Sequence, residues 1–399
     1  MPKNIKGCTI SELQEFAVSL GEKPYRGTQL FHALYRMMVL SFEEITTMSK
    51  QFRAQLQDAA TIETLHLVSV NASPQDNTTK FLFKLSDEKY IESVLIPSQT
   101  FEYDDDGEAT RRPRLTLCIS TQVGCPLDCV FCATGTMGLQ RNLTAGEIVE
   151  QVLFIKRMLL SDNAEHSFNL NEDNKTLTNV VFMGMGEPML NFENVQKAVE
   201  ILSTGIEISA KRITISTAGI PEKIKQMADE QPRTKLAISL HSLDEVVRAK
   251  LMPITNKYSL HELFSAAEYY YAKTKQRITF EYILFDGVND TDEDIHRIVR
   301  MSKRIPCKIN IIPFHPITFA NPASYGATLR ATPYVRTEKF IEQLRERNVS
   351  VFVRSSSGED IQAACGQLVT ESARRRQTIS KREEHKKSNT VSIPSLVLQ

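Results

Sequence analysis

The sequence predicts an α/β fold: a partial barrel of six strand–helix units, preceded by a small N-terminal helical domain and a short antiparallel meander. Three observations lead to this prediction. Residues 1–62 carry apolar side chains at helical spacing, residues 66–97 alternate apolar with polar side chains, and the chain from Leu115 onward alternates strand-like with helix-like segments. Six units are too few for a closed eight-unit barrel, so we expect an open sheet.

The composition is that of a large globular protein. Its 399 residues are 41% hydrophobic and 24% charged, and 48 basic and 48 acidic residues give a net charge of zero. A nucleic-acid partner is therefore not indicated by bulk charge, and any basic surface must be local. Because no apolar run of about eighteen residues and no signal-peptide core are present, we expect a cytosolic protein with reduced cysteines.

The N-terminal residues 1–62 are expected to be an accessory domain that either contacts RNA or only packs against the barrel. Ser11 to Leu20 has helical periodicity, and the following stretch interleaves aromatic with basic residues such as Arg26 and Arg36. Residues 63–110 are expected to hold the meander (LHLVSV, TKFLFKLS and YIESVLIP) and a polar linker.

Residues 111–345 are expected to form the barrel, with chemistry at the carboxyl ends of its parallel strands. Thr144 and Glu147 form a capping box that predicts a helix start, and another helix is expected to begin near Asp290 or Thr291. The strand candidates are LTLCI (115–119), NVVFMG (179–184), RITIS (212–216), KLAISLH (235–241), RITFEYILF (277–285) and KINIIPF (308–314).

The remaining segments interrupt or follow the barrel. The polar stretch 161–177 is expected to be a surface insertion, and residues 346–372 a C-terminal strand with a cysteine loop. Residues 373–399 form a basic tail, which composition predicts to be disordered and solvated, and which could also contact RNA.

Four of the seven cysteines cluster between Leu115 and Gly135. Cys125, Cys129 and Cys132 are spaced C-x3-C-x2-C, with Cys118 upstream. A structural zinc site needs four ligands and usually has two C-x2-C pairs. A [4Fe–4S] cluster fits better, because three thiolates can hold three irons and leave the fourth open. From spacing alone, zinc and unrelated thiols remain alternatives.

The cysteine spacing, with Phe131 before the last cysteine, resembles the signature of radical S-adenosylmethionine enzymes. VVFMGMGEPMLN, RITISTAGI, LAISLHS, LMPI and DIQAACGQL, in this order, resemble the dual-specificity rRNA and tRNA adenine-C2 methyltransferases. The resemblance implies a [4Fe–4S] cluster on Cys125, Cys129 and Cys132. It also implies two S-adenosylmethionines consumed per methylation, the cluster's open iron binding the amine and carboxylate of S-adenosylmethionine.

The same resemblance implies the substrates and partners. The targets would be C2 of adenine in 23S rRNA, at the peptidyl transferase centre, and in tRNA, 3′ of the anticodon. An electron donor such as flavodoxin would be needed, the enzyme would be a monomer in the cytosol, and no membrane would be involved.

Three residues have catalytic roles by the same resemblance. Cys365, in AACGQL, would carry the methyl group, Cys118 would attack its sulfur to release the product, and Glu92 would accept the C2 proton. Without the resemblance, Cys365 would be a small buried hydrophobe and Glu92 a surface strand residue. Cys118 alternates with polar Thr116 and Ser120, which favours a functional side of its strand.

Residues at the strand ends are expected to contact S-adenosylmethionine. Glycine in GMGEP allows close backbone approach, and the glutamate can accept from the cofactor's amino group. Two positions depart from the family pattern: His315 stands where Asn is usual, and Ser357 where Arg is common, with Arg354 as a possible replacement. The expected contacts are Gly186, Glu187, Ser216, Ser239, Leu240, His241 and His315.

Two other functions compete with this one. An antibiotic-resistance relative methylates C8 of the same adenine, and GEP in place of GEA favours the C2 enzyme. A zinc-dependent RNA-binding protein without catalysis is the alternative of a different class.

Overall fold

A computed structural model describes residues 2–98, 102–103, 109–111, 114–161, 176–230, 233–317, 325–354 and 357–369. Most of the polar insertion, the acidic stretch after Tyr103 and the basic tail lie outside the described residues. The predictions for these three segments therefore stay predictions.

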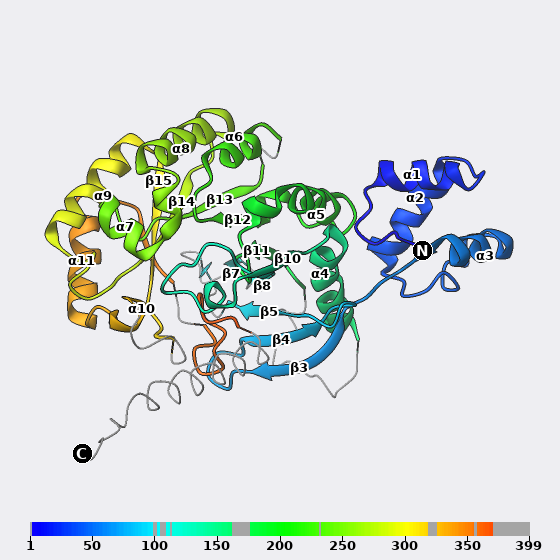
Figure 1. The fold of residues 1–399 in the computed structure, drawn as a ribbon, viewed down its shortest axis with the longest axis horizontal. Helices are drawn as coiled ribbons and strands as arrows, with labels where there is room; N and C mark the ends of the chain where they lie inside the picture. The colour runs from blue at the N-terminus through cyan, green and yellow to red at the C-terminus, as the bar shows by residue number, and fades with distance from the viewer. Residues whose placement is uncertain are drawn as a thin grey trace, which may run out of the picture.

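One ten-stranded sheet forms the centre of the molecule, in the order β16-β15-β14-β13-β12-β11-β8-β5-β4-β3 (Figure 1). From β8 to β16 all neighbours are parallel. All six predicted strands are present, the sheet ends at β3 and β16 without closing, and the predicted open α/β barrel is confirmed. The parallel strands are β8 (Leu115–Cys118), β11 (Asn179–Phe182), β12 (Ile213–Thr217), β13 (Lys235–Ser239), β14 (Ile278–Ile283), β15 (Cys307–Ile312) and β16 (Val351–Val353).

The predicted meander is continuous with the barrel sheet. It consists of β3 (His66–Ala72), β4 (Thr79–Lys84) and β5 (Tyr90–Pro97), and β5 pairs antiparallel with β8 so that Val94 lies opposite Cys118. This pairing brings the meander beside the first barrel strand. Two further short strands, β6 (Glu102–Tyr103) and β7 (Ala109–Arg111), pair with each other.

Helices cover the outside of the parallel strands, as Figure 1 shows. Both predicted caps are confirmed: Thr144 with Glu147 opens α4, and Thr291 with Asp294 opens α9. The helices are α4 (Ala145–Leu160), α5 (Phe192–Thr204), α6 (Pro221–Glu230), α7 (Glu245–Leu251), α8 (Leu260–Thr274), α9 (Asp292–Arg304), α10 (Tyr325–Thr328) and α11 (Tyr334–Glu346). Short 3-10 turns lie at Gly135–Met137, Pro188–Asn191, Ala210–Arg212 and Pro253–Asn256.

The N-terminal residues form a helical unit beside α4 and α5 (Figure 1). Its helices are α1 (Ile10–Ser19), α2 (Tyr25–His32) and α3 (Lys50–Ala59), with a π-helical turn at Ala33–Met37. The sequence pattern missed a short parallel pair, β1 (Lys3–Asn4) with β2 (Ala60–Thr61), which joins the two ends of the unit. Two-residue strands are too short to show periodicity.

A buried contact fixes this unit against the barrel. Lys6 Nζ lies 2.7 Å from Glu150 Oε2 on α4, and both side chains are almost fully buried. Next to them, a Cβ on Gly7 would come within 2.2 Å of the backbone nitrogen of Gly146. The two glycines therefore allow backbone contact that any side chain would prevent.

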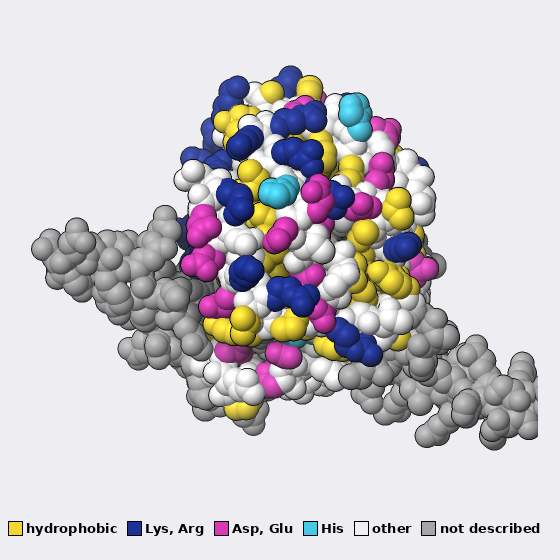
Figure 2. All heavy atoms as spheres, turned by 90° about the vertical axis from the view of Figure 1, so that its left-hand side faces the viewer, with side chains coloured by type: hydrophobic (Ala, Val, Ile, Leu, Met, Phe, Trp, Pro, Cys, Tyr) yellow, Lys and Arg dark blue, Asp and Glu magenta, His cyan; other side chains and the backbone are white. Residues whose placement is uncertain are grey.

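The face that carries α9 and α11, on the left of Figure 1, mixes basic and acidic side chains (Figure 2). On α9, Arg300 pairs with Glu293, and Arg304 pairs with Glu268. No helix in the described ranges is long and apolar enough to cross a membrane.

Candidate active site

A β-hairpin carries the three-cysteine loop. Strands β9 (Gln122–Gly124) and β10 (Leu139–Asn142) pair antiparallel, and Cys125 N donates to Gly138 O at 3.1 Å where the loop leaves the hairpin. Gly124 has φ +79°, and a Cβ there would lie 1.8 Å from the same carbonyl oxygen. Only glycine fits this position, so the sequence itself defines where the loop begins.

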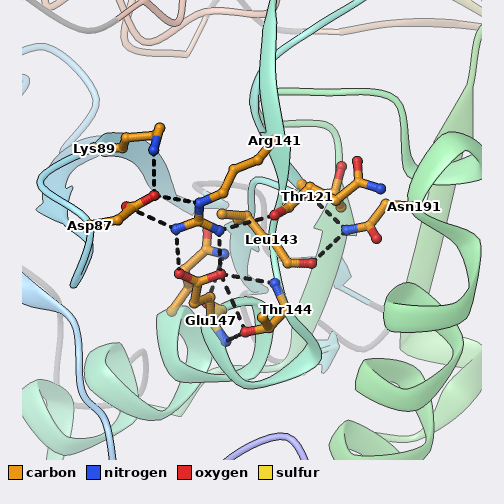
Figure 3. Close-up of polar contacts among 10 residues, drawn as sticks. Asp87, Lys89, Thr121, Arg141, Leu143, Thr144, Glu147 and Asn191 are labelled. Carbon is orange, nitrogen blue, oxygen red and sulfur yellow. Dashed lines mark hydrogen bonds and ion pairs between the residues drawn. The ribbon is translucent and has the colours of Figure 1, made fainter.

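Polar contacts fasten the hairpin to its surroundings (Figure 3). The guanidinium of Arg141 donates to both carboxylate oxygens of Asp87, in the β4–β5 turn, and to both of Glu147 at the start of α4. This guanidinium holds the pKa of Asp87 well below its usual range. Asn191 Nδ2 donates to the carbonyls of Thr121 and Leu143 at 2.8 and 2.7 Å. These contacts fix the position of the hairpin from which the three-cysteine loop extends.

The three thiols of the loop lie near one another. Burial raises the pKa of Cys125 to about 12, with Cys132 contributing next, and burial also raises the pKa values of Cys129 and Cys132. Bound iron would replace these thiol protons, because metal binding to cysteine releases the proton. Within the described ranges, no three His, Cys, Asp or Glu side chains are arranged to hold a single ion.

The segment that carries Cys365 is hydrogen-bonded directly to this loop. Ala133 N donates to Gly366 O at 2.6 Å, and Thr134 Oγ1 donates to Leu368 O at 2.7 Å. Gly366 has φ +83°, and a Cβ there would lie 3.1 Å from Phe131 O. Residues far apart in the chain are therefore joined beside the three-cysteine loop.

Cys118 and Cys365 line one cavity at the carboxyl end of β8. Burial raises the pKa of Cys118 to about 12, with a further contribution from Cys365, while the positive charge of Arg354 opposes this shift. The cavity is lined by Ile96, Cys118, Met183, Ile312, Pro313, His315, Arg354, Ser357, Ala363, Ala364, Cys365 and Leu368.

Arg354 is a charged group next to the two cysteines. Its Nη1 lies 3.3 Å from Met183 Sδ, and Cys365 is the main cause of its raised pKa. The sequence analysis considered Arg354 only as a replacement for an arginine at position 357. Its place one residue after β16, at the carboxyl end of a parallel strand, was the signal that could have identified it.

Glu92 is buried, with 5% of its surface exposed, so the alternative of a surface strand residue is wrong. Its Oε2 accepts from Val369 N at 2.9 Å, and its Oε1 lies 3.5 Å from Lys80 Nζ. Glu92 does not appear among the residues that line the cavity of Cys118 and Cys365. Its role as proton acceptor stays a prediction.

Glu187 links the ends of β11 and β12. Its carboxylate accepts from Met189 N at 3.0 Å and from Ala218 N at 2.8 Å, and burial raises its pKa. Gly186 has φ +99°, and a Cβ there would lie 2.5 Å from Gln122 Cβ. The two residues therefore have clear structural roles, and their contact with S-adenosylmethionine stays a prediction.

Arg248 binds backbone carbonyls at the carboxyl ends of β12 and β13. The sequence analysis missed this residue. It is 1% exposed and donates to the backbone carbonyls of Ala218, Ser239 and Leu240 at 2.7, 3.0 and 3.1 Å. Desolvation lowers its pKa to about 10. Nothing in the local pattern marks an arginine of a short helix as buried.

Ser216, at the end of β12, is half-buried.

His241 follows β13 in the left-handed conformation, with φ +55°. Its Nδ1 accepts from Ile283 N at 3.1 Å, and its ring meets Phe131 edge-on at 4.6 Å. Burial lowers its pKa to about 3, and the charge of Arg248 lowers it further. The imidazole is therefore neutral at physiological pH.

We expect His241→Asn to make the free energy of unfolding depend less on pH below pH 7. The folded-state pKa of about 3 lies below the value of about 6.5 for an unfolded imidazole, so the unfolded chain binds more protons between them. Stability should fall with decreasing pH by up to about 1.4 kcal/mol per pH unit from this group. Asparagine can accept from Ile283 N and tolerates positive φ. Urea unfolding between pH 7 and 4.5 measures the slope, and an equal slope in the variant would contradict the assignment.

His315 lies in the cavity of Cys365, and its Nδ1 is 3.1 Å from Glu359 Oε1. A second hollow of Ala133, Pro316, Glu359, Gln362 and Gln367 adjoins it. His315 thus lines the cavity of Cys365, and its expected contact with S-adenosylmethionine stays a prediction.

Comparisons with known proteins agree with this geometry. The Radical SAM superfamily matches residues 119–300, and the Ribosomal RNA large subunit methyltransferase N-terminal domain matches residues 3–62. A probable dual-specificity RNA methyltransferase RlmN of Christiangramia forsetii is 41% identical over 93% of this chain and 97% of its own. The dual-specificity RNA methyltransferase RlmN of Desulfotalea psychrophila is 40% identical over 92% and 95%.

A solved radical SAM methyltransferase from Sphaerobacter thermophilus superposes with a TM-score of 0.77. It is 37% identical and covers 92% of this chain and 99% of its own. These relatives match over most of the chain, and the chain belongs to the RlmN family of radical S-adenosylmethionine RNA methyltransferases.

Proposed function

We propose that the chain methylates C2 of adenine in 23S rRNA, at the peptidyl transferase centre, and in tRNA, 3′ of the anticodon. The observation that carries this proposal is the cavity shared by Cys118 and Cys365 beside the three-cysteine loop. C2 lies between two ring nitrogens and is electron-poor, so it cannot attack a methyl sulfonium as an amine does. A carrier cysteine with a resolving cysteine supplies the alternative route.

The chain's residues fit the cofactors of its superfamily. Cys125, Cys129 and Cys132 would hold a [4Fe–4S] cluster. The one-electron cleavage of bound S-adenosylmethionine at this cluster would provide a radical that removes hydrogen from a methyl group. The residues that would bind S-adenosylmethionine are Gly186, Glu187, Ser216, Ser239, Leu240, His241 and His315.

Cys365 carries the methyl carbon in the proposed reaction. Its thiolate takes a methyl group from a first S-adenosylmethionine, forming one carbon–sulfur bond as the sulfonium bond breaks. After a hydrogen atom is removed, the methylene carbon bonds to C2. Glu92 accepts the C2 proton, and the unpaired electron left on the adduct returns to the electron donor, such as flavodoxin, that supplied the electron for the cleavage of S-adenosylmethionine.

Cys118 then releases the product. Its thiolate attacks the sulfur of Cys365, the sulfur–carbon bond breaks, and the carbon keeps the electron pair and takes up a proton to become the new methyl group. A dithiol reductant returns two electrons to the Cys118–Cys365 disulfide. Two S-adenosylmethionines are consumed in each cycle.

The N-terminal residues 1–62 would contact the RNA. Arg36 pairs with Glu207 at 2.8 Å, with both side chains largely exposed, so a phosphate could replace this carboxylate at little cost. Residues 63–110 would be the meander and linker, 111–345 the barrel, and 346–372 the strand and catalytic loop. We further propose a monomer in the cytosol.

Nucleoside analysis tests the proposal. Reconstituted protein is incubated without oxygen with S-adenosylmethionine, a reductant and either a 23S rRNA fragment or a tRNA, and the digested RNA is analysed by mass spectrometry. We expect 2-methyladenosine from both substrates. If the product is 8-methyladenosine, the enzyme acts on C8, and colourless protein with one zinc ion and no product would contradict the radical route.

A further inference from the structure

The segment that carries Cys365 has little secondary structure of its own. Residues 357–369 contain turns but no helix or strand. Within it, Gln362 adopts φ +53°, an uncommon backbone conformation for a residue other than glycine. Such a conformation persists where neighbouring contacts hold it in place. The position of the Cys365 thiol therefore depends on contacts from other parts of the chain.

A buried ion pair of the meander contacts this segment on both sides of Cys365. Lys80, on β4, is 6% exposed, and its Nζ donates to Gln362 O at 3.1 Å. The same Nζ lies 3.5 Å from Glu92 Oε1 on the neighbouring strand β5. Glu92 Oε2 in turn accepts from Val369 N at 2.9 Å. One charged pair thus binds a carbonyl before Cys365 and an amide after it.

These contacts are strong because each one involves a charged side chain. Hydrogen bonds to charged groups contribute about 1.5–3 kcal/mol, roughly twice a neutral one. Lys80 faces Val94 and Leu82 faces Glu92 across the β4–β5 ladder, so Lys80 and Glu92 are diagonal neighbours on one face of the sheet. The sheet fixes the positions of both side chains, and their hydrogen bonds fix the backbone of the irregular segment that carries Cys365.

We propose that Lys80 is a positioning residue for Cys365: with Glu92 it clamps the segment Gln362–Val369 so that the Cys365 thiol faces Cys118. This inference rests on the proposed function, and it assigns to Lys80 a role distinct from the proton transfer proposed for Glu92. The clamp matters because Cys365 must meet both Cys118 and the methyl donor, and a displacement of about 1 Å can cost on the order of a hundredfold in rate.

Thiol pairing tests the clamp. Protein expressed under iron limitation, so that Cys365 is unmethylated, is reconstituted with iron and sulfide and treated with diamide without oxygen. Diamide takes two electrons and two protons from the two thiols, and the Cys118–Cys365 disulfide is followed by peptide mass spectrometry. Lys80→Met is compared with wild type and with Lys84→Met, which removes a lysine of the same strand that pairs with Glu88 on the surface.

We expect Lys80→Met to slow pairing by about tenfold to a hundredfold at equal iron content, and Lys84→Met to pair at the wild-type rate. In turnover, kcat should fall by a similar factor while KM for tRNA stays unchanged, with kcat expressed per folded, iron-loaded enzyme so that a loss of folded protein does not count as a loss of rate. Pairing of Lys80→Met at the wild-type rate would overturn the proposal.

A double variant separates the clamp from the cost of an unpaired buried charge. Lys80→Met with Glu92→Gln removes both charges and leaves an acceptor for Val369 N, so the fold should tolerate it better than Lys80→Met alone. Pairing should remain slow, because Gln362 O still lacks its donor, and recovery of the wild-type rate would refute the clamp. If wild type yields no 2-methyladenosine while the pairing rates differ as expected, the proposed function fails and the clamp stands.

Discussion

Cys118→Ala should stop turnover and leave RNA covalently attached to the protein through Cys365. Methylation of Cys365 and addition to C2 do not need the Cys118 thiol, whereas cleavage of the sulfur–carbon bond does. Release of methylated RNA should fall by on the order of 10³-fold or more, as when one member of a catalytic unit is removed. A denaturing gel with labelled tRNA detects the adduct as a band of protein-linked RNA.

The control for this variant is Cys8→Ala, since Cys8 is also buried but lies in the N-terminal unit. It should release product normally and show no adduct. Cys118→Ala combined with Cys365→Ala should show no adduct either. Normal product release by Cys118→Ala alone would remove the resolving role from this thiol.

Cys125→Ala should abolish the cluster and all methylation. Two remaining thiolates cannot hold the three irons that the wild-type loop would bind, so anaerobically purified variant should lose the brown colour and the absorbance typical of iron–sulfur proteins. Iron analysis and the visible spectrum measure this loss, and product formation should fall below detection.

Cys307→Ala is the matched control, because Cys307 is a buried cysteine of β15 outside the loop. We expect it to keep its iron. Equal iron in Cys125→Ala and wild type would show that the loop is not the cluster site.

Much of the fold follows from local patterns. The barrel strands are short segments rich in buried apolar side chains, such as Ile213–Thr217 and Cys307–Ile312, and this local pattern predicts them. Thr144 and Thr291 mark helix starts by capping chemistry that depends only on neighbouring residues. The pairing of β5 with β8 was not predicted, because strand order depends on contacts between segments rather than on the periodicity within either one.

The residues of the site likewise divide into those that local sequence patterns predict and those that depend on contacts between distant segments. The C-x3-C-x2-C spacing is local and could be interpreted from the sequence, and the family motifs linked Cys118 to Cys365. The contacts of Lys80 with Gln362 and of Glu92 with Val369 span 282 and 277 residues and have no local signature. Arg248 was missed for a related reason: a buried arginine that binds three carbonyls looks like any surface arginine in sequence.

Isotope transfer from labelled S-adenosylmethionine tests the central claim most directly. The enzyme is turned over several times with S-adenosylmethionine that carries a trideuterated methyl group, and the modified adenosine is analysed by mass spectrometry. If Cys365 carries the carbon as a methylene group, one deuterium is lost before the bond to C2 forms, and the product methyl group should hold two deuteriums and one solvent hydrogen. A product that keeps all three deuteriums would mean direct methyl transfer and would contradict the account.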